Sequence, residues 1–299
     1  MFGWMTLLLG AALAAPASSQ KHFEVEKDEQ SWAFSYRWKD AAGEKQTVKF
    51  SLPTDAVEAD RDEVTWLQRK EMNTAVAQDV RKWGKSQKGV KVKVNVENGG
   101  VRTQVSGDRS KAKAALKASE GVRDAAVDAW LSDNGFTRLG KNISFDHAGL
   151  AASYADELAP VAAALRADAP DDRVFVERAL SFVQSIPYEA RKKKGGDPGY
   201  RRPLALLSRN RGDCDSKSVL FLAMVRAELP EVPLSVIYVP EHALTGVGLE
   251  AASTDRTFKA DGVTFVYAEP VGPALHPLGE PADANKKAGK KGEVRIVPR

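Results

Sequence analysis

The first part of the chain alternates strictly between apolar and polar residues. Two neighbouring runs carry large apolar side chains at every second position, which puts these side chains on one face of a strand. The runs are Trp32, Phe34, Tyr36 and Trp38, followed by Val48, Phe50 and Leu52. A turn-forming segment at 40–43 separates them, so the pattern predicts a β-hairpin with one aromatic face. We expect this face to belong to a core rather than to a carbohydrate-binding platform.

The spacing then changes to that of a helix and back again. Apolar residues from Asp55 to Trp83 recur at helical intervals. Apolar residues alternate again in 90–96 and in 101–105, on either side of an Asn-Gly-Gly turn, which predicts a second hairpin. Two strands, a helix and two further strands predict a small α+β domain over residues 21–107.

Helical spacing dominates the next part of the chain. It predicts one amphipathic helix over 110–131 and another over 174–186. Between them, 150–165 fits either a pair of helices or one helix kinked at Pro160. We expect these helices to belong to a second domain over residues 110–280. Together with the predicted hairpins, they make the expected fold class α+β.

Cys214 is the single cysteine of the chain, and it stands at the predicted start of a helix. It follows Gly212 and Asp213, and the apolar run 219–225 comes after it. Asp is a good N-cap and Gly permits a sharp entry turn, so Cys214 falls in the first helical turn. There the unpaired backbone N–H groups and the helix dipole favour the thiolate, which is the nucleophilic form. The alternative is a buried structural cysteine.

Two strand patterns downstream each lead to a residue that could assist this thiol. The run 234–239 leads to His242, and the run 263–268 leads to Glu269. A cysteine nucleophile needs a base to accept its proton and a third group to orient that base. Cys214, His242 and Glu269 are therefore candidates for a catalytic triad.

This order of helix with Cys, strand with His and strand with acid resembles the transglutaminase-like superfamily of papain-like cysteine enzymes, especially its secreted bacterial peptidase branch. The resemblance spans roughly 171 to 273. The motifs that carry it are Gly212-Asp213-Cys214-Asp215-Ser216-Lys217-Ser218, His242-Ala243 and Tyr267-Ala268-Glu269-Pro270.

The resemblance implies a papain-like catalytic domain with a helical part and an antiparallel sheet. In it, Cys214 is the nucleophile, His242 the general base and Glu269 the orienting acid. The chain departs from the family at two positions, because family members usually carry Asp where Glu269 stands and often an aromatic residue where Leu244 stands.

Such enzymes also need a donor for the developing oxyanion, and Gln184 and Tyr188 are candidates for it. Their alternative roles are those of a surface amide and of a tyrosine at the core edge. Basic residues gather after Tyr188, where they form either a solvated connector or a rim that steers an anionic substrate. These residues are Lys192, Lys193, Lys194, Arg201 and Arg202.

The ends and the charge of the chain add further expectations. An apolar stretch followed by Ala15-Pro16-Ala17 predicts an export signal over residues 1–17, and hence a periplasmic or extracellular protein. No later stretch reaches the roughly 18 apolar residues of a membrane helix, so we expect no stable membrane insertion. The Lys- and Gly-rich segment 281–299 is expected to be a flexible basic tail. A formal net charge of +4, from 44 basic and 40 acidic residues, does not indicate nucleic-acid binding.

No zinc-ligand spacing, phosphate loop or dinucleotide fingerprint is present in the sequence, so we expect no metal and no cofactor. The sequence predicts an exported cysteine peptidase or amidase, or a transamidase, that acts through a thioester on a peptide or protein substrate. A cell-envelope substrate with negative charge would suit the basic rim. The alternative is a module of the same fold that binds or assembles without turnover.

Overall fold

A computed structural model describes residues 19–61, 64–97, 99–189, 199–239 and 242–298 of the chain. The architecture is mixed α+β with antiparallel strand pairs, which confirms the expected α+β class. The helices are α1 (Thr54–Asp60), α2 (Arg69–Lys85), α3 (Arg109–Asp133), α4 (His147–Ser153), α5 (Ala155–Arg166), α6 (Asp172–Ser185), α7 (Pro203–Arg209), α8 (Cys214–Glu228) and α9 (Ala288–Lys291), with a short 3₁₀ turn at Asp283–Asn285. The strands are β1 (Gln20–Lys27), β2 (Ser31–Lys39), β3 (Lys45–Pro53), β4 (Val64–Trp66), β5 (Val90–Glu97), β6 (Gly100–Gly107), β7 (Phe136–Leu139), β8 (Asn142–Phe145), β9 (Gly199–Arg201), β10 (Leu234–Val239), β11 (His242–Val247), β12 (Thr257–Ala260), β13 (Val263–Ala268) and β14 (Glu293–Ile296).

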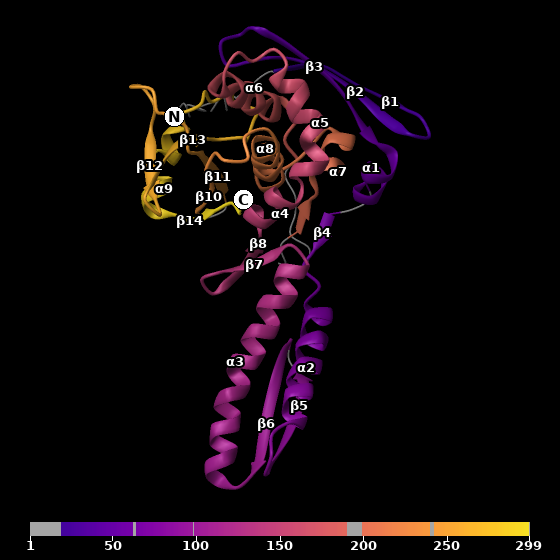
Figure 1. Ribbon diagram of the computed structural model, residues 1–299, viewed down its shortest axis with the longest axis vertical. Coiled ribbons are helices and arrows are strands. Elements are labelled where there is room, and N and C mark those ends of the chain that lie inside the picture. Colours follow the sequence, from indigo (N-terminus) through magenta and orange to yellow (C-terminus); the bar gives the residue numbers. More distant parts are fainter. Residues whose placement is uncertain (1–18, 62–63, 98, 190–198, 240–241, 299) are drawn as a thin grey trace, which may run out of the picture.

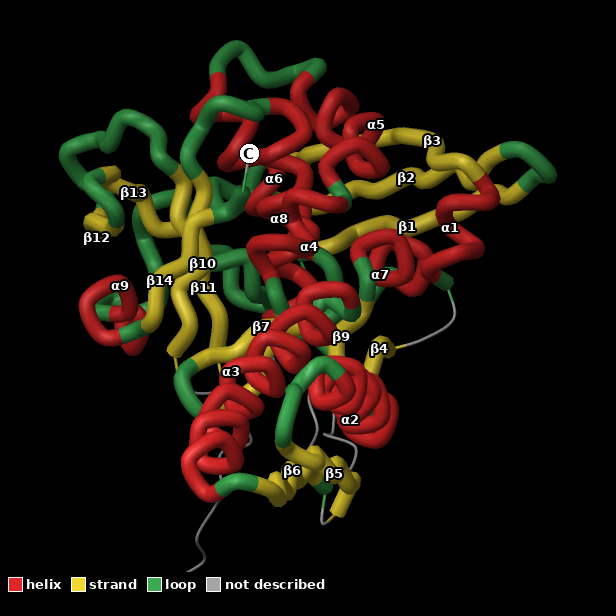
Figure 2. Tube along the Cα trace, turned by 60° about the horizontal axis from the view of Figure 1, so that its bottom comes forward, coloured by secondary structure: helices red, strands yellow, loops and turns green. Residues whose placement is uncertain are grey.

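Helix α8 is the central helix of the main body. On one side lies a five-stranded sheet in the order β12-β13-β11-β10-β14, and α4, α5 and α6 pack around the rest of the helix (Figures 1 and 2). The apolar run 219–225 is buried along its whole length, because it is covered on all sides. The fold thus holds Cys214, the first residue of α8, at one end of a rigid element.

The sheet of β1, β2 and β3 covers the other side of these helices. The rings of Tyr36 and Trp38 lie 4.9 and 5.4 Å from the ring of Phe182 in α6, and Trp38 Nε1 donates to the Ser181 hydroxyl at 3.0 Å. The aromatic face is therefore core, as expected. It shares one continuous core with α5, α6 and α8, so this sheet is not part of the separate domain expected over 21–107.

The rest of that expected domain forms an elongated lobe with a helix from further along the chain. Helices α2 and α3 pack against one face of the two-stranded sheet β5–β6, and Figure 1 shows the lobe projecting from the main body. Its interior is formed by apolar residues of all four elements, with part of the cluster reaching into the body. These residues include Met72, Val76, Val80, Val94, Val101 and Leu131.

Most of the helix predictions agree with the structure. Helices α3, α6 and α8 cover the expected ranges, and 150–165 forms a pair of helices, α4 and α5, with Pro160 inside α5. The single helix expected over 55–83 is wrong, because β4 interrupts it. The β-branched Val64 and Thr65 pair with β9, a partner more than 130 residues away that the local pattern does not reveal.

The flexible tail expected over 281–299 is also wrong, since this segment completes the main body. Strand β14 pairs with β10 at the edge of the five-stranded sheet. Helix α9 covers one face of the sheet, where Ala288 is buried and the Gly289 N–H donates to the Tyr267 hydroxyl at 2.7 Å. A four-residue strand among lysines and glycines is too short to produce a recognisable pattern.

No helix within the described ranges is long and apolar enough to cross a membrane. The predicted export signal at 1–17 lies outside the described residues.

Candidate active site

Local interactions make Cys214 the first residue of α8. The Asp213 carboxylate accepts a hydrogen bond from the Ser216 N–H at 3.0 Å, which is the geometry of an N-cap. A Cβ at Gly212 would approach Leu206 Cδ1 to 2.5 Å, so the entry turn requires glycine unless the Leu206 side chain moves. The predicted helix start is therefore confirmed.

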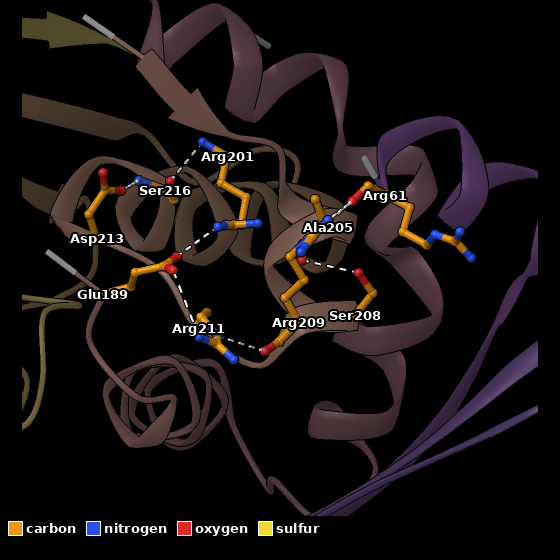
Figure 3. A network of polar contacts seen from close by, with 9 residues as sticks. All are labelled: Arg61, Glu189, Arg201, Ala205, Ser208, Arg209, Arg211, Asp213 and Ser216. Atoms are coloured by element: carbon orange, nitrogen blue, oxygen red, sulfur yellow. Dashed lines mark hydrogen bonds and ion pairs between the residues drawn. The ribbon is translucent and has the colours of Figure 1, made fainter. Parts of the chain in front are cut away.

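A polar network holds the loop in front of Cys214 (Figure 3). The Glu189 carboxylate lies 2.7 Å from the Arg201 guanidinium and 3.9 Å from that of Arg211. The Arg201 backbone N–H donates to the Ser216 hydroxyl at 3.1 Å. The described segments on both sides of 190–198 are thus tied to the start of α8.

Two of the basic residues expected to steer a substrate form internal ion pairs. Arg201 is buried and pairs with Glu189, and Arg202 Nη1 lies 3.3 Å from the buried carboxylate of Asp60. Both guanidinium groups make internal contacts, and the substrate-steering role expected of them stays a prediction. The other three steering candidates lie outside the described residues, and their role stays a prediction. They are Lys192, Lys193 and Lys194.

The structure brings His242 and Glu269 together. His242 opens β11 and Glu269 directly follows β13, which is paired with β11; His242 Nε2 lies 3.2 Å from Glu269 Oε1. The Glu269 carboxylate is only 6% exposed and also accepts hydrogen bonds from the Ala282 N–H at 2.8 Å and the Asn285 amide at 2.7 Å. Burial raises the pKa of Glu269, but the hydrogen bonds from His242 and from the Ala282 N–H, with the nearby His276 and His242 charges, outweigh burial and hold the pKa below its ordinary value. Glu269 is therefore ionised at neutral pH and can orient an imidazole.

The thiol of Cys214 is connected to this pair through the packing of α8 on β11. The Ser218 hydroxyl donates to the Ala243 carbonyl at 3.5 Å, which joins the second turn of α8 to the start of β11. Cys214 lies one turn before Ser218 on the same helix face, and His242 is the residue before Ala243. Within the part of the chain that the structure describes, no hydrogen bond joins the thiol to His242, so that contact stays a prediction.

The environment of Cys214 favours the neutral thiol. Burial, followed by the charges of Asp215 and Asp213, raises the pKa of Cys214 to about 12. Hydrogen bonds from the Asp215 and Cys214 N–H groups at the helix start lower the pKa, but by less. The thiolate expected from the helix position alone is therefore not the resting form, because a helix dipole is weaker than burial combined with two adjacent carboxylates.

The two oxyanion candidates have different surroundings. The Gln184 side chain is buried, and its amide nitrogen donates to the carbonyls of Glu269 at 2.9 Å and His276 at 2.8 Å. Both amide hydrogens are used, so Gln184 is not available as an oxyanion donor, in contrast to the expectation. Tyr188 is 47% exposed and bridges to Gly212, two residues before Cys214. Its position is compatible with the predicted role.

Lys217, within the cysteine motif, is a buried residue that the sequence did not single out. Its ammonium donates to the Ile186 carbonyl at the end of α6, and burial lowers the pKa of Lys217 to about 7. A Cβ at Gly272 would come within 2.1 Å of the Gln184 carbonyl oxygen, so the segment after Glu269 passes closely over the same helix end. Lys217 therefore fastens α8 to α6, near the segment that carries Glu269.

A second histidine–carboxylate pair, which the sequence analysis missed, lies beside Cys214. His147 is fully buried at the start of α4, and its Nε2 lies 2.9 Å from Oδ1 of Asp215. Its Nδ1 lies 3.1 Å from the Tyr238 hydroxyl and 3.2 Å from the Phe145 carbonyl. His147 has no access to a substrate, so we assign it the role of positioning Asp215. The only sequence signal was an isolated His after Asp146, which caps α4.

Replacing His147 with Phe should lower the free energy of unfolding by about 1–3 kcal/mol, because it leaves buried hydrogen-bonding groups without a partner. Tyr238→Phe removes one hydroxyl from the same cluster and should cost about 1 kcal/mol. Urea unfolding of both variants and of the double variant tests this. Strictly additive losses would show that the two side chains do not act as one cluster.

Other binding features do not meet at this site. A cavity of about 640 Å³ lies between α6, the β2–β3 turn and segment 276–278, but none of the three predicted triad residues lines it. Among the described residues, no group of three or more His, Cys, Asp or Glu side chains is arranged to hold a metal ion.

The chain matches no protein-family model, no curated protein and no solved structure.

Proposed function

We propose that the protein is a transglutaminase-like cysteine hydrolase of papain-like fold that cleaves amide bonds. Cys214 would be the nucleophile, His242 the general base and Glu269 the orienting acid. The observation that carries this proposal is the hydrogen bond between His242 and a buried, ionised Glu269, on strands that pack beside the helix opened by Cys214. A buried carboxylate that fixes an imidazole is the usual partner arrangement of a catalytic base.

The proposed reaction starts from a neutral thiol. As Sγ of Cys214 attacks the amide carbonyl carbon, His242 accepts the thiol proton and Glu269 stabilises the imidazolium. Backbone N–H groups at the start of α8 donate to the oxyanion, with Tyr188 as a further candidate donor. The C–N bond then breaks, the imidazolium gives its proton to the departing amine, and a thioester remains on Cys214. Water completes hydrolysis, whereas an amine would complete transamidation.

We favour hydrolysis of a peptide or protein substrate outside the cytoplasm. This rests on the resemblance to the secreted peptidase branch and on the predicted export signal. A neutral thiol next to an imidazole works as the serine hydroxyl does in serine hydrolases, where the base acts during the attack and not before it.

The second candidate is a module of the same fold without turnover. Two observations favour it: the raised pKa of Cys214 and the absence of a thiol–imidazole hydrogen bond among the described residues. In this case Cys214 would be a structural cysteine, and His242–Glu269 would fasten β11 to β13.

Alkylation of the single cysteine separates the two candidates. Because the pKa of Cys214 is about 12, its reaction with iodoacetamide should accelerate about tenfold per pH unit from pH 7 to 10, without a plateau near neutrality. A peptide chloromethyl ketone, which presents a carbonyl to the site, should instead label Cys214 at pH 7 with the help of His242. His242→Gln should slow this labelling by about 100-fold or more.

Mass spectrometry of the intact protein measures both reactions. Labelling by the ketone that is equally fast with and without His242, or that needs denaturant, would support the module. A plateau of the iodoacetamide rate near pH 7 would instead show a preformed thiolate. The pH profile of His242→Gln with iodoacetamide serves as the control, because base catalysis is not needed once the thiolate forms.

A further inference from the structure

The positive charge of the protein is concentrated in its lobe. Residues 81–117 include the end of α2, both strands β5 and β6 and the start of α3. They contain eleven Lys and Arg against two acidic residues, out of 44 and 40 in the whole chain. The other residues therefore hold 33 basic and 38 acidic side chains, so segment 81–117 and the rest of the chain have opposite net charge. The modest total of +4 conceals this separation.

Few cations of segment 81–117 are engaged inside the lobe. Among the described residues of this segment there is one ion pair, at 3.7 Å, between Arg102 and Glu97, and Arg81 donates to the Val94 carbonyl. The other acidic residue, Asp108, caps α3, because its carboxylate accepts hydrogen bonds from the backbone N–H groups of Ser110 and Lys111. So many like charges on one segment create a positive potential that attracts anions.

Three of these eleven cations, Lys91, Lys93 and Arg102, lie on an open, polar face of the β5–β6 ribbon. Val92 and Val94 point toward α2 and α3, and the residues that alternate with them point outward. The outward pairs across the ribbon are Lys91 with Ser106, Lys93 with Gln104, and Asn95 with Arg102. Each of these six side chains can donate hydrogen bonds and none is buried. One acidic residue, Glu97, stands at the end of the same row, where it accepts from the Asn95 amide at 3.0 Å and lies 3.7 Å from Arg102. Successive outward side chains on one strand are two residues, or about 6.8 Å, apart.

We propose that this open face of the β5–β6 ribbon binds a flexible linear polyanion, which it recognises through phosphate groups. A row of cations with hydrogen-bond donors between them matches a chain of regularly spaced anions with several acceptor oxygens each. The lobe would then hold such a polymer, while the main body carries the Cys214 site separately. This inference does not depend on the proposed catalytic function.

The composition of the face favours a polymer over the two other anionic partners. Adsorption to an anionic membrane is usually strengthened by apolar side chains that enter the interface. Among the described residues of the lobe, the exposed large apolar side chains are Val96 and Leu116, and neither is on this face. Recognition of nucleic-acid bases on single strands uses aromatic side chains for stacking, and the six outward residues include none. What the face offers is charge and hydrogen-bond donors, which suit the repeated charged groups of a polymer backbone.

The test is binding of fluorescently labelled long-chain inorganic polyphosphate, followed by anisotropy as a function of salt. The variant Lys91→Gln, Lys93→Gln, Arg102→Gln removes three cations from the face. Each lost phosphate contact lowers the slope of log K against log salt by about 0.7, so the slope should fall by about 2 and the affinity at 0.1 M salt by about 100-fold. Replacing Lys91 and Lys93 by Arg should preserve the binding.

A matched control is Lys39→Gln, Lys45→Gln, Lys49→Gln, which removes three exposed lysines from β2 and β3 of the main body. It should bind polyphosphate almost as the wild type does, and thermal unfolding should show that all variants are folded. Equal binding by the control and ribbon variants, or none by wild type, would overturn the proposal. Polyglutamate bound as tightly would rule out phosphate recognition, tighter binding of a dT20 oligonucleotide would show base recognition, and tighter binding of phosphatidylglycerol vesicles would show a membrane site.

Discussion

Replacing Cys214 with alanine should abolish amide cleavage and leave the fold intact. The thiol is the only group of the proposed site that can form the covalent intermediate, so no other residue can take over its step. In a serine protease, loss of the nucleophile alone lowers kcat by about 10⁶-fold, and a loss of similar size is expected here. Turnover of a fluorogenic peptide library by wild type and variant, at matched concentration, measures it.

Stability measurements make this result specific. Cys214 is only partly buried and contributes no hydrogen bond to another side chain among the described residues. Cys214→Ala should therefore lower the free energy of unfolding by no more than about 1 kcal/mol. Cys214→Ser, which keeps the shape but offers a poorer nucleophile, should be folded and nearly inactive as well. An inactive wild type together with a strongly destabilised alanine variant would identify Cys214 as a structural cysteine.

The elements around the candidate site could be predicted because their signals are local. The cap at Asp213 and the apolar run after Cys214 specify α8 within fifteen residues. The strands before His242 and Glu269 are short runs of β-branched and aromatic residues, and the structure places them in one sheet. Local capping and periodicity are sufficient there, since each element forms where its own sequence favours it.

The errors arose where distant segments decide the structure. Strand β4 forms because β9 is available to pair with it, and β14 because the edge of β10 is free to accept it. The aromatic hairpin was assigned to the wrong domain, since its alternation predicts one buried face but not which element covers that face. Register with a partner far along the chain is a property of the fold, and no local pattern encodes it.

The chemistry of the site was predicted less completely than its position. The sequence indicates a thiol at a helix start, but the pKa of Cys214 depends on burial and on the adjacent Asp213 and Asp215 carboxylates. Likewise, Gln184 has a suitable residue type, yet its amide is used by two carbonyls from a segment about ninety residues away. His147 was passed over because its partner Asp215 is 68 residues away. Electrostatics and hydrogen-bond partners therefore required the three-dimensional structure.

Replacing Glu269 with Gln should reduce the rate of cleavage strongly, by up to about 10⁴-fold, the loss measured for the equivalent acid of a serine protease. A neutral amide cannot stabilise the His242 imidazolium or fix its tautomer. The structure adds a cost in stability, because both Glu269 oxygens accept hydrogen bonds and one would be replaced by an NH₂ group facing a donor. We expect about 1–3 kcal/mol, most of it from the connection to Ala282 and Asn285.

Asn285→Ala separates these two effects. It removes one hydrogen bond to the Glu269 carboxylate but keeps the charge and the contact with His242. It should therefore cost about 1 kcal/mol of stability while kcat/KM changes only a few-fold. If it lowers the rate as much as Glu269→Gln does, Glu269 acts by fastening the C-terminal segment and not as the orienting acid.

The pH dependence of stability gives an independent measure of the same carboxylate. The folded-state pKa of Glu269 lies below its ordinary value of 4.5, so its ionisation stabilises the fold above about pH 4.5. This contribution is lost as the pH falls from there through the folded-state pKa. Urea unfolding of wild type should therefore weaken more steeply below pH 4.5 than that of Glu269→Gln, which has no proton to bind at this position. Parallel curves for the two proteins would show that the buried carboxylate is not held ionised by its contacts with His242 and Ala282, and the proposed orienting acid would lose its physical basis.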